Sequence, residues 1–273
     1  RAMNQSSVLF ISSSSFQVLL RMFRSLPVSR LAAPKEMNTM PVGPAPRPLV
    51  VVTGAGRGVG FATALALVRT HRAQVIAVSR DVSAWNAVKE EGITPLTADV
   101  ATEEGRATVV RAVDGRPLAG LINNAGLLLK RNLGTWTAAD LERLHTVNVA
   151  APLLLTQALL PALRAASSAH VVNIGSMGGF QGSIKFPGLV GYSASKAALA
   201  CMSECLAEEW KDTTVRCNCL CLGAVDTDML REAFPGYVAP VSADTMGGYI
   251  AAFLLDGHNL LNGKVLPLSL STP

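Results

Sequence analysis

The sequence predicts an α/β protein with a single doubly wound parallel sheet of seven strands and helices on both faces. From Pro48 onward, short apolar runs rich in β-branched residues alternate with longer stretches of helical periodicity. A glycine-rich turn follows the first apolar run directly. Because no repeat or break in composition follows, we expect one domain over residues 48–273.

Seven segments are expected as strands, because each is a nearly continuous apolar run of the kind found in strands buried on both faces. In chain order they are Leu49–Thr53, Gln74–Ser79, Thr94–Ala98, Gly120–Ile122, His170–Ile174, Val215–Cys221 and Lys264–Leu268. Helices are expected near residues 58–70, 102–113, 138–164, 191–211 and 242–255. In such a sheet, ligands bind at the carboxyl ends of the strands.

The first 47 residues differ from the rest in composition. They hold six basic side chains against one acid, Glu36, together with a run of serines at 12–15. None of their apolar stretches approaches the roughly 18 residues that a membrane span needs. We expect 1–47 to be a disordered extension, such as a tag, translated upstream sequence or a transit-like peptide, and we expect no membrane association.

Charge and cysteine usage exclude several classes of protein. Residues 48–273 carry 18 basic and 18 acidic side chains, so no basic stripe favours nucleic acid. The five cysteines all lie between Cys201 and Cys221, and an odd, clustered count in a chain of this size indicates reduced thiols in the cytoplasm. Cys217, Cys219 and Cys221 alternate along one strand without a Cys-x-x-Cys pair, so we expect buried apolar residues and no metal site.

The glycine-rich turn reads Thr53-Gly-Ala-Gly-Arg-Gly-Val-Gly60. Gly54 permits a tight turn, Gly58 lets the backbone approach a pyrophosphate, and Gly60 allows close packing of the helix that begins near Val59. The amino end of that helix favours negative charge. The turn therefore predicts a dinucleotide site of the Rossmann type, although a merely tight loop is the alternative reading.

Coenzyme choice depends on the end of the second strand, which reads Val78-Ser79-Arg80. An acid at the Ser79 position would bind the ribose 2′-hydroxyl and repel a 2′-phosphate, and none is present. Arg80 and Arg57 can instead clamp a 2′-phosphate, so NADP(H) is preferred over NAD(H). Asp81 would weaken this prediction if the strand ended one residue later.

Five motifs in order resemble the short-chain dehydrogenase/reductase family. They are Thr53-Gly-x-x-x-Gly-x-Gly60, Asn123-Asn-Ala-Gly126, Asn148, Ser176 and Tyr192-x-x-x-Lys196. The resemblance spans residues 48–270, and it implies an NAD(P)(H)-dependent oxidoreductase that transfers hydride between the nicotinamide and a carbonyl or hydroxyl carbon.

The residues themselves support a catalytic centre at Tyr192. Tyr192 and Lys196 are four apart on a predicted helix and share a face, so the ammonium is expected to lower the pKa of the phenol. Ser176 ends a strand, where its hydroxyl can hydrogen-bond a substrate oxygen as negative charge develops. The alternative is that Tyr192 and Lys196 are a side-chain pair on the helix surface and that Ser176 is a capping serine.

The resemblance implies a role for each matching residue. Tyr192 would protonate the carbonyl oxygen, Lys196 would also hold the nicotinamide ribose, and Asn148 would hold a water that relays protons to Lys196. The implied cofactor contacts are Asn124, Ala125 and Gly126 on the adenine side, Asp99 and Val100 at the adenine ring, and Val225 and Thr227 near the carboxamide.

Two departures from the family pattern affect the substrate end. Leu222-Gly223 replaces the usual Pro-Gly, and fifteen residues separate Ser176 from Tyr192. Met177, Phe186 and Phe234 are expected to contact the substrate, which would be an apolar or partly aromatic carbonyl compound or alcohol. Further expected lining residues are Leu127, Leu128, Leu129, Met229 and Tyr237, while Lys185 and Arg231 are the candidates to meet an anionic substrate.

Two other functions compete with a reductase. A non-catalytic dinucleotide-binding sensor or scaffold would keep the fold, but such proteins usually lose catalytic residues that are intact here. An epimerase or dehydratase would need further acid/base groups, which the sequence does not single out.

The resemblance also implies a homodimer or homotetramer formed through the helices near 138–164 and 191–211.

Overall fold

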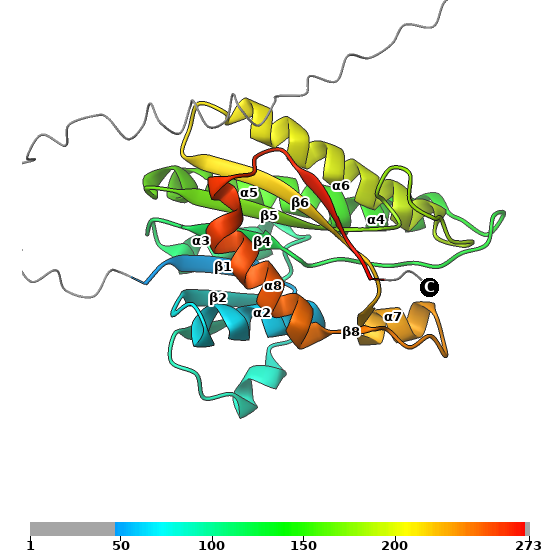
Figure 1. The fold of residues 1–273 in the computed structure, drawn as a ribbon, viewed down its shortest axis with the longest axis horizontal. Helices are drawn as coiled ribbons and strands as arrows, with labels where there is room; N and C mark the ends of the chain where they lie inside the picture. Colours follow the sequence, from blue (N-terminus) through cyan, green and yellow to red (C-terminus); the bar gives the residue numbers. More distant parts are fainter. Residues whose placement is uncertain (1–46, 271–273) are drawn as a thin grey trace, which may run out of the picture. The chain divides into compact units, whose positions relative to one another are not determined.

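The computed structural model describes residues 47–270 and contains one seven-stranded sheet (Figure 1). Neighbouring strands are parallel, in the order β3-β2-β1-β4-β5-β6-β9, which confirms the doubly wound fold. The strands are β1 (Leu49–Thr53), β2 (Gln74–Ser79), β3 (Ile93–Thr97), β4 (Gly120–Asn123), β5 (Ala169–Ser176), β6 (Val215–Leu222) and β9 (Val265–Leu268). The predicted extension lies outside the described residues, apart from Arg47.

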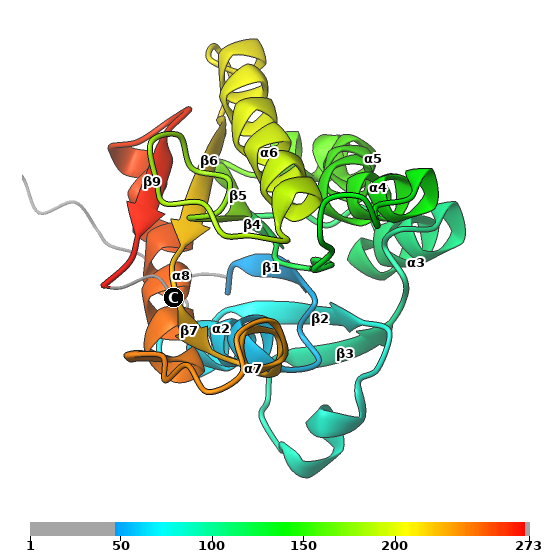
Figure 2. The ribbon, with the colours of Figure 1, turned by 90° about the vertical axis from the view of Figure 1, so that its right-hand side faces the viewer.

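Helices cover both faces of the sheet (Figure 2). One face carries α2 (Gly58–Arg69) and α8 (Ala243–Asp256), and the other carries α3 (Glu103–Val113), α5 (Ala151–Ala165) and α6 (Val190–Glu209). Within β1, Val51 packs into the core of the second face, whereas Val50 and Val52 pack into the core of the first. This alternation explains why the central strands read as continuous apolar runs.

The two edge strands depart from the prediction of burial on both faces. In β3 every residue is at least partly exposed, and β9 is only half-buried. Each edge strand has a partner on one side only, because β3 pairs with β2 and β9 pairs with β6. Pro95 and Pro267 each lie in one of these edge strands, where a residue that lacks an N–H is tolerated.

The helix predicted over residues 138–164 is interrupted. It consists of α4 (Ala138–His145), a π-helical turn (Thr146–Ala150) and α5. By length and composition the combined segment 138–165 could cross a membrane. However, Leu144, Leu155, Leu159 and Leu163 are buried in the domain, so the apolar character of this segment serves the core.

Several short elements were not predicted. They are the 3-10 helices η1 (Ser83–Ala87) and η3 (Gly257–Asn259), the helix α7 (Asp228–Ala233), and the two-residue strands β7 (Val225–Asp226) and β8 (Val241–Ser242). β7 and β8 pair with each other in a separate parallel sheet. Together β7 and α7 form the segment that leaves the carboxyl end of β6, at the edge where ligands are expected.

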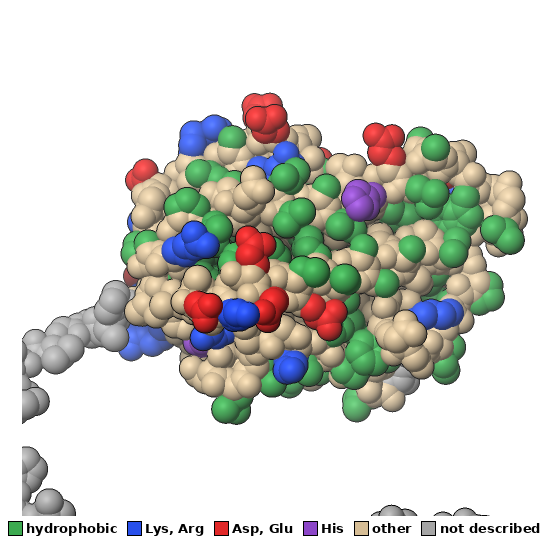
Figure 3. Space-filling view, turned by 90° about the horizontal axis from the view of Figure 1, so that it is seen from above, with side chains coloured by type: hydrophobic (Ala, Val, Ile, Leu, Met, Phe, Trp, Pro, Cys, Tyr) green, Lys and Arg blue, Asp and Glu red, His purple; other side chains and the backbone are tan. Residues whose placement is uncertain are grey.

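All five cysteines are free thiols, and Cys217, Cys219 and Cys221 are fully buried in β6. The sulfurs of Cys219 and Cys221 lie 4.0 Å apart, which confirms that alternate positions share one face. On the face of the domain drawn in Figure 3, acidic and basic side chains lie interspersed among apolar and neutral ones.

Candidate active site

One continuous cavity of about 630 Å³ lies at the carboxyl ends of the strands. Among the residues predicted to be catalytic, to bind the cofactor or to contact the substrate directly, all but Gly60 and Asn148 line it. These are Gly54, Arg57, Gly58, Val59, Arg80, Asp99, Val100, Asn124, Ala125, Gly126, Ser176, Met177, Phe186, Tyr192, Lys196, Val225, Thr227 and Phe234. The fold thus brings into one space residues that lie up to 180 positions apart in the sequence.

The glycine-rich turn is fixed to the segment that follows β4. The Thr53 hydroxyl accepts the backbone N–H groups of Asn124 (3.0 Å) and Ala125 (3.1 Å). In return, the Asn124 side-chain amide donates to the carbonyls of Thr53 (3.0 Å) and Gly54 (3.2 Å). The turn therefore has a defined shape before any ligand binds.

Four glycines of this turn are required, for three different reasons. Gly54 and Gly58 have φ of +65° and +58°, in the left-handed region. A Cβ at Gly56 would lie 2.6 Å from the Ser79 hydroxyl, a close approach that was not predicted. Gly60 does not line the cavity, and a side chain there would collide with the Gly54 carbonyl, so its role is helix packing.

The residues at this turn fit a pyrophosphate. Arg57 is the N-cap of α2, and within the described residues it makes no side-chain hydrogen bond to the first turn, which holds no acid. The first N–H groups of a helix lack partners within the helix, and they attract anions. The glycine-rich turn and the amino end of α2 are thus suited to bind the phosphates of a dinucleotide.

Basic side chains surround the expected adenosine end. Arg80 is exposed and lines the cavity, and the Arg57 side chain is 72% exposed. Asp81 does not turn inward, because its carboxylate accepts the backbone N–H of Ser83 at 2.8 Å, and this bond lowers the pKa of Asp81. Trp85, which was not predicted, is buried and donates to the Ala55 carbonyl at 3.0 Å, so η1 supports the glycine-rich turn.

Tyr192, Lys196 and Ser176 all line the cavity. Tyr192 and Lys196 lie on α6 and are buried, and Ser176 ends β5. Burial raises the pKa of the Tyr192 phenol, and its hydrogen bond with Ser176 opposes this rise. Burial also lowers the pKa of the Lys196 ammonium from 10.5 to about 8.

The expectation that Lys196 lowers the pKa of Tyr192 is wrong for this structure. The Lys196 ammonium donates to the Ile174 carbonyl at 2.8 Å, so it is directed at β5. Desolvation of the phenolate is then the largest influence on Tyr192. The spacing of four residues correctly predicted that Tyr192 and Lys196 share one face of the helix. It could not predict which group the Lys196 ammonium contacts.

Asn148 lies behind the cavity, in the π-helical turn. Its Oδ1 accepts the Leu127 N–H at 2.8 Å, and its Nδ2 donates to the Leu127 carbonyl (2.8 Å) and to the Ser195 hydroxyl (2.9 Å). Ser195 in turn donates to the Tyr192 carbonyl at 2.7 Å. The side chain of Asn148 therefore connects the segment after β4 with the start of α6, next to the predicted catalytic residues.

Apolar side chains form the other end of the cavity. Leu127, Leu128, Met177 and Leu189 line it, and the rings of Phe186 and Phe234 meet edge-on with centroids 5.3 Å apart. Leu129 and Tyr237, which were expected to line this mouth, are not among the cavity residues. Lys130, which was not predicted, lies 4.9 Å from the Phe234 ring centroid and donates to the Ala233 carbonyl.

The two predicted anion-binding residues do not line the cavity. Lys185 donates to the Phe180 carbonyl at 2.6 Å. Arg231 forms ion pairs with Asp226 and with Asp228. Both cations are therefore engaged by groups of the protein.

The Leu222-Gly223 segment follows a defined path despite the missing proline. The Leu222 carbonyl accepts the Met177 N–H at 2.9 Å, and the Gly223 N–H donates to the Leu268 carbonyl at 2.8 Å. A Cβ at Gly223 would lie 2.6 Å from that of Ser269, so the close contact with the end of β9 requires glycine. Both residues line the cavity.

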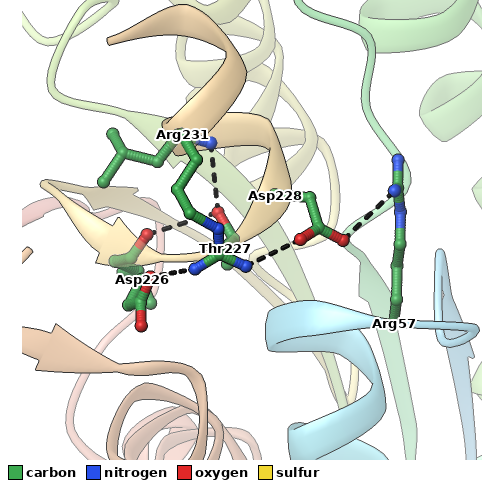
Figure 4. A network of polar contacts seen from close by, with 7 residues as sticks. Arg57, Asp226, Thr227, Asp228 and Arg231 are labelled. Atoms are coloured by element: carbon green, nitrogen blue, oxygen red, sulfur yellow. Dashed lines mark hydrogen bonds and ion pairs between the residues drawn. The ribbon is translucent and has the colours of Figure 1, made fainter. Parts of the chain in front are cut away.

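A chain of ion pairs links the glycine-rich turn with α7 (Figure 4). Arg57 contacts Asp228 at 3.3 Å, Asp228 contacts Arg231 at 2.7 Å, and Arg231 contacts Asp226. The Thr227 hydroxyl caps α7 by accepting the Leu230 N–H at 3.3 Å. Asp228 lines the cavity but was not identified from the sequence. Over residues 47–270, no group of three or more potential metal ligands gathers.

Comparisons with known proteins point to one family. A family profile described as short chain dehydrogenase matches residues 48–237. The chain is 35% identical over 208 residues to the ketoacyl reductase HetN of a Nostoc species, covering 71% of each chain. It is 31% identical to the short-chain dehydrogenase/reductase olcF of Penicillium canescens over 75% of this chain and 79% of that one. It is 32% identical to an L-xylulose reductase of Caenorhabditis elegans over 67% and 74%.

Solved structures share the fold. A Pseudomonas aeruginosa RhlG structure in complex with NADP matches with a TM-score of 0.72 and 25% identity, over 81% of this chain and 94% of that chain. A 3-ketoacyl-(acyl-carrier-protein) reductase of Brucella melitensis, complexed with NADH, matches with a TM-score of 0.71 and 24% identity, over 81% and 96%.

Proposed function

Since the chain belongs to the short-chain dehydrogenase/reductase family, we propose that it is an NADP(H)-preferring carbonyl reductase or alcohol dehydrogenase in which Tyr192 is the general acid/base. The observation that carries this proposal is the convergence of Tyr192, Ser176 and Lys196 in the cavity that also holds the glycine-rich turn. The family is one of NAD(P)-dependent oxidoreductases, and its substrates are typically small carbonyl compounds and alcohols.

In the direction of reduction, bound NADPH supplies a hydride to the carbonyl carbon. The Tyr192 hydroxyl donates its proton to the carbonyl oxygen, so the product is a neutral alcohol and a phenolate remains on the enzyme. The Ser176 hydroxyl donates a hydrogen bond to the same oxygen while negative charge develops there. The Lys196 ammonium, with its pKa lowered to about 8, remains largely protonated at neutral pH and can stabilise the phenolate after a shift away from Ile174.

The raised pKa of Tyr192 favours this direction. A phenol in a dry site holds its proton at neutral pH, so it begins the reaction as an acid. Oxidation of an alcohol would require the phenolate at the start. The protonated phenol is the form of Tyr192 that carbonyl reduction uses.

The coenzyme preference is supported by charge. Arg57 and Arg80 both line the cavity, the Ser79 position carries no acid, and the Asp81 carboxylate faces the backbone of η1. A 2′-phosphate would therefore meet two cations at the end of β2, where neither position 79 nor Asp81 presents a carboxylate to it.

The substrate is proposed to be a neutral, apolar ketone or aldehyde. The side chains packed around Tyr192 that line the cavity are apolar, and they include Leu128, Phe186 and Phe234. Lys185 and Arg231, the candidates for an anionic substrate, have partners within the protein. A polyol such as a sugar would lose hydrogen bonds to water without finding donors and acceptors on these side chains.

The test is an assay of NADPH and NADH oxidation with a panel of apolar ketones, sugars and keto acids. We expect turnover with NADPH and apolar ketones, and a loss of about 10²–10⁴-fold in kcat for Tyr192→Phe. Tyr249→Phe is the matched control, because Tyr249 is an exposed tyrosine outside the cavity. Full turnover by Tyr192→Phe would exclude the catalytic role, and coenzyme binding without any turnover would favour a sensor or scaffold.

A further inference from the structure

The ion pair between Arg57 and Asp228 joins two segments that are 171 residues apart in the chain (Figure 4). Arg57 immediately precedes α2, and Asp228 is the first residue of α7. Both side chains line the cavity. The Oδ2 atom of Asp228 contacts Arg57, while its Oδ1 atom contacts Arg231. Asp228 therefore holds one cation with each carboxylate oxygen.

The two cations are not held equally. Arg231 contacts two carboxylates, Asp226 and Asp228, and its contact with Asp228 is 2.7 Å long. Among the described residues, the Arg57 side chain pairs only with Asp228, at 3.3 Å, and it is 72% exposed. Arg57 can consequently leave the carboxylate at little cost, while Arg231 continues to neutralise Asp228.

This arrangement creates a competition for one guanidinium. Arg57 is one of the two basic side chains that the proposed function assigns to a 2′-phosphate. In this structure its partner is a carboxylate of the protein. A phosphate dianion and a carboxylate seek the same planar donors of an arginine. A ligand that carries the 2′-phosphate must therefore take Arg57 from Asp228.

We propose that Asp228 is a coenzyme-specificity residue, whose carboxylate occupies Arg57 until a 2′-phosphate displaces it. This proposal rests on the proposed NADP(H) preference. It predicts that Asp228 weakens the binding of NADP(H), while leaving coenzymes without a 2′-phosphate nearly unaffected. Exposed ion pairs are weak, so removing this one should strengthen binding of the 2′-phosphate about two- to fivefold.

The chain offers a matched control for the variant Asp228→Asn. Asp226 lies two residues earlier, has a similarly exposed side chain (57% against 51%), and also pairs with Arg231. It makes no contact with Arg57 in the described residues. Asp226→Asn therefore removes the same charge from the same network without releasing Arg57.

The test compares two probes that differ only in the 2′-phosphate, adenosine 2′,5′-bisphosphate and adenosine 5′-monophosphate. Binding to the full chain is measured by isothermal titration calorimetry at low salt. The Asp228→Asn variant should bind the bisphosphate about two- to fivefold more tightly than the wild type does, and its affinity for the monophosphate should be unchanged. Asp226→Asn should change neither. In an Arg57→Gln background, Asp228→Asn should no longer affect the bisphosphate.

Three results would overturn the role of Asp228: equal tightening for both probes, the same gain from Asp226→Asn, or a gain that persists without Arg57. Asp228→Ser provides a second variant if the asparagine variant unfolds, since serine is also tolerated at the start of a helix. If Arg57→Gln alone does not weaken binding of the bisphosphate, the proposed coenzyme assignment fails. If it does weaken binding while both Asp228 variants are neutral, only the role of Asp228 fails.

Discussion

Lowering the pH is predicted to destabilise the domain through one buried histidine, His170 in β5. His170 is fully buried, and its ring nitrogens contact the Leu254 carbonyl and the Asn218 amide, each at 2.9 Å. The Asn218 Oδ1 atom accepts the Lys264 N–H, so its Nδ2 group must face His170 as a donor. The Nε2 atom of His170 is therefore an acceptor, and the ring is held in the neutral form with its proton on Nδ1.

Burial lowers the pKa of His170 from 6.5 to about 4 in the folded state. Between these values the unfolded chain binds a proton that the folded chain does not, so the free energy of unfolding falls as the pH falls. The stability that neutral His170 allows is fully present above pH 6.5, and it is lost progressively as the pH falls to about 4. A shift of this size corresponds to about 3 kcal/mol, at about 1.4 kcal/mol for each pH unit.

Urea denaturation followed by circular dichroism between pH 4 and 8 measures this effect. His170→Gln should be less stable than the wild type at pH 7.5, because it disturbs the contacts with Asn218 and Leu254, and its disadvantage should shrink toward pH 4. His145→Gln, at an exposed histidine on α4, controls for the loss of a histidine elsewhere. A stability difference between wild type and His170→Gln that stays constant over this range would refute the reasoning.

Two further predictions concern packing and the substrate mouth. Gly247→Ala should destabilise the domain, because a Cβ there would lie 2.7 Å from the backbone of α2, whereas Gly248→Ala, with nothing within 4 Å, should stabilise α8 by about 0.5–1 kcal/mol. Thermal melting of the two variants should shift in opposite directions, and equal shifts would contradict the packing argument. Phe186→Ala and Phe234→Ala should each raise KM for apolar ketones about tenfold through lost contact area, with KM for NADPH unchanged in steady-state assays. A rise in KM for NADPH of the same size would show that these rings support the coenzyme end instead.

The fold could be predicted from the sequence because the central strands are buried on both faces and read as unbroken apolar runs. The interruption near Asn148 could not, since helical periodicity continues from α4 through α5. The π-helical turn lies where the Asn148 side chain bonds Leu127 and Ser195, which are 21 and 47 residues away. Contacts over such distances leave no periodic signal in the sequence.

The sequence predicted those site residues that lie at or just after the carboxyl end of a strand. Gly56, Trp85 and Asp228 were missed because each acts through a tertiary contact, with Ser79, Ala55 and Arg57 respectively. The spacing of residues in a motif predicts which of them lie on the same helix or strand. It does not predict which helices and strands contact one another in the fold. The same limit explains the incorrect pKa expectation for Tyr192.

Both ends of the cavity depend on α7, a helix of six residues that is only about 9 Å long. Asp228 begins it and contacts Arg57 beside the glycine-rich turn, while Phe234 follows its last residue and meets Phe186 at the apolar mouth. Thr227, the N-cap residue just before Asp228, lies against the same turn, since a Cβ at Gly58 would be 3.4 Å from its methyl group. The same short helix and its flanking residues therefore contribute to both the coenzyme end and the apolar mouth of the cavity.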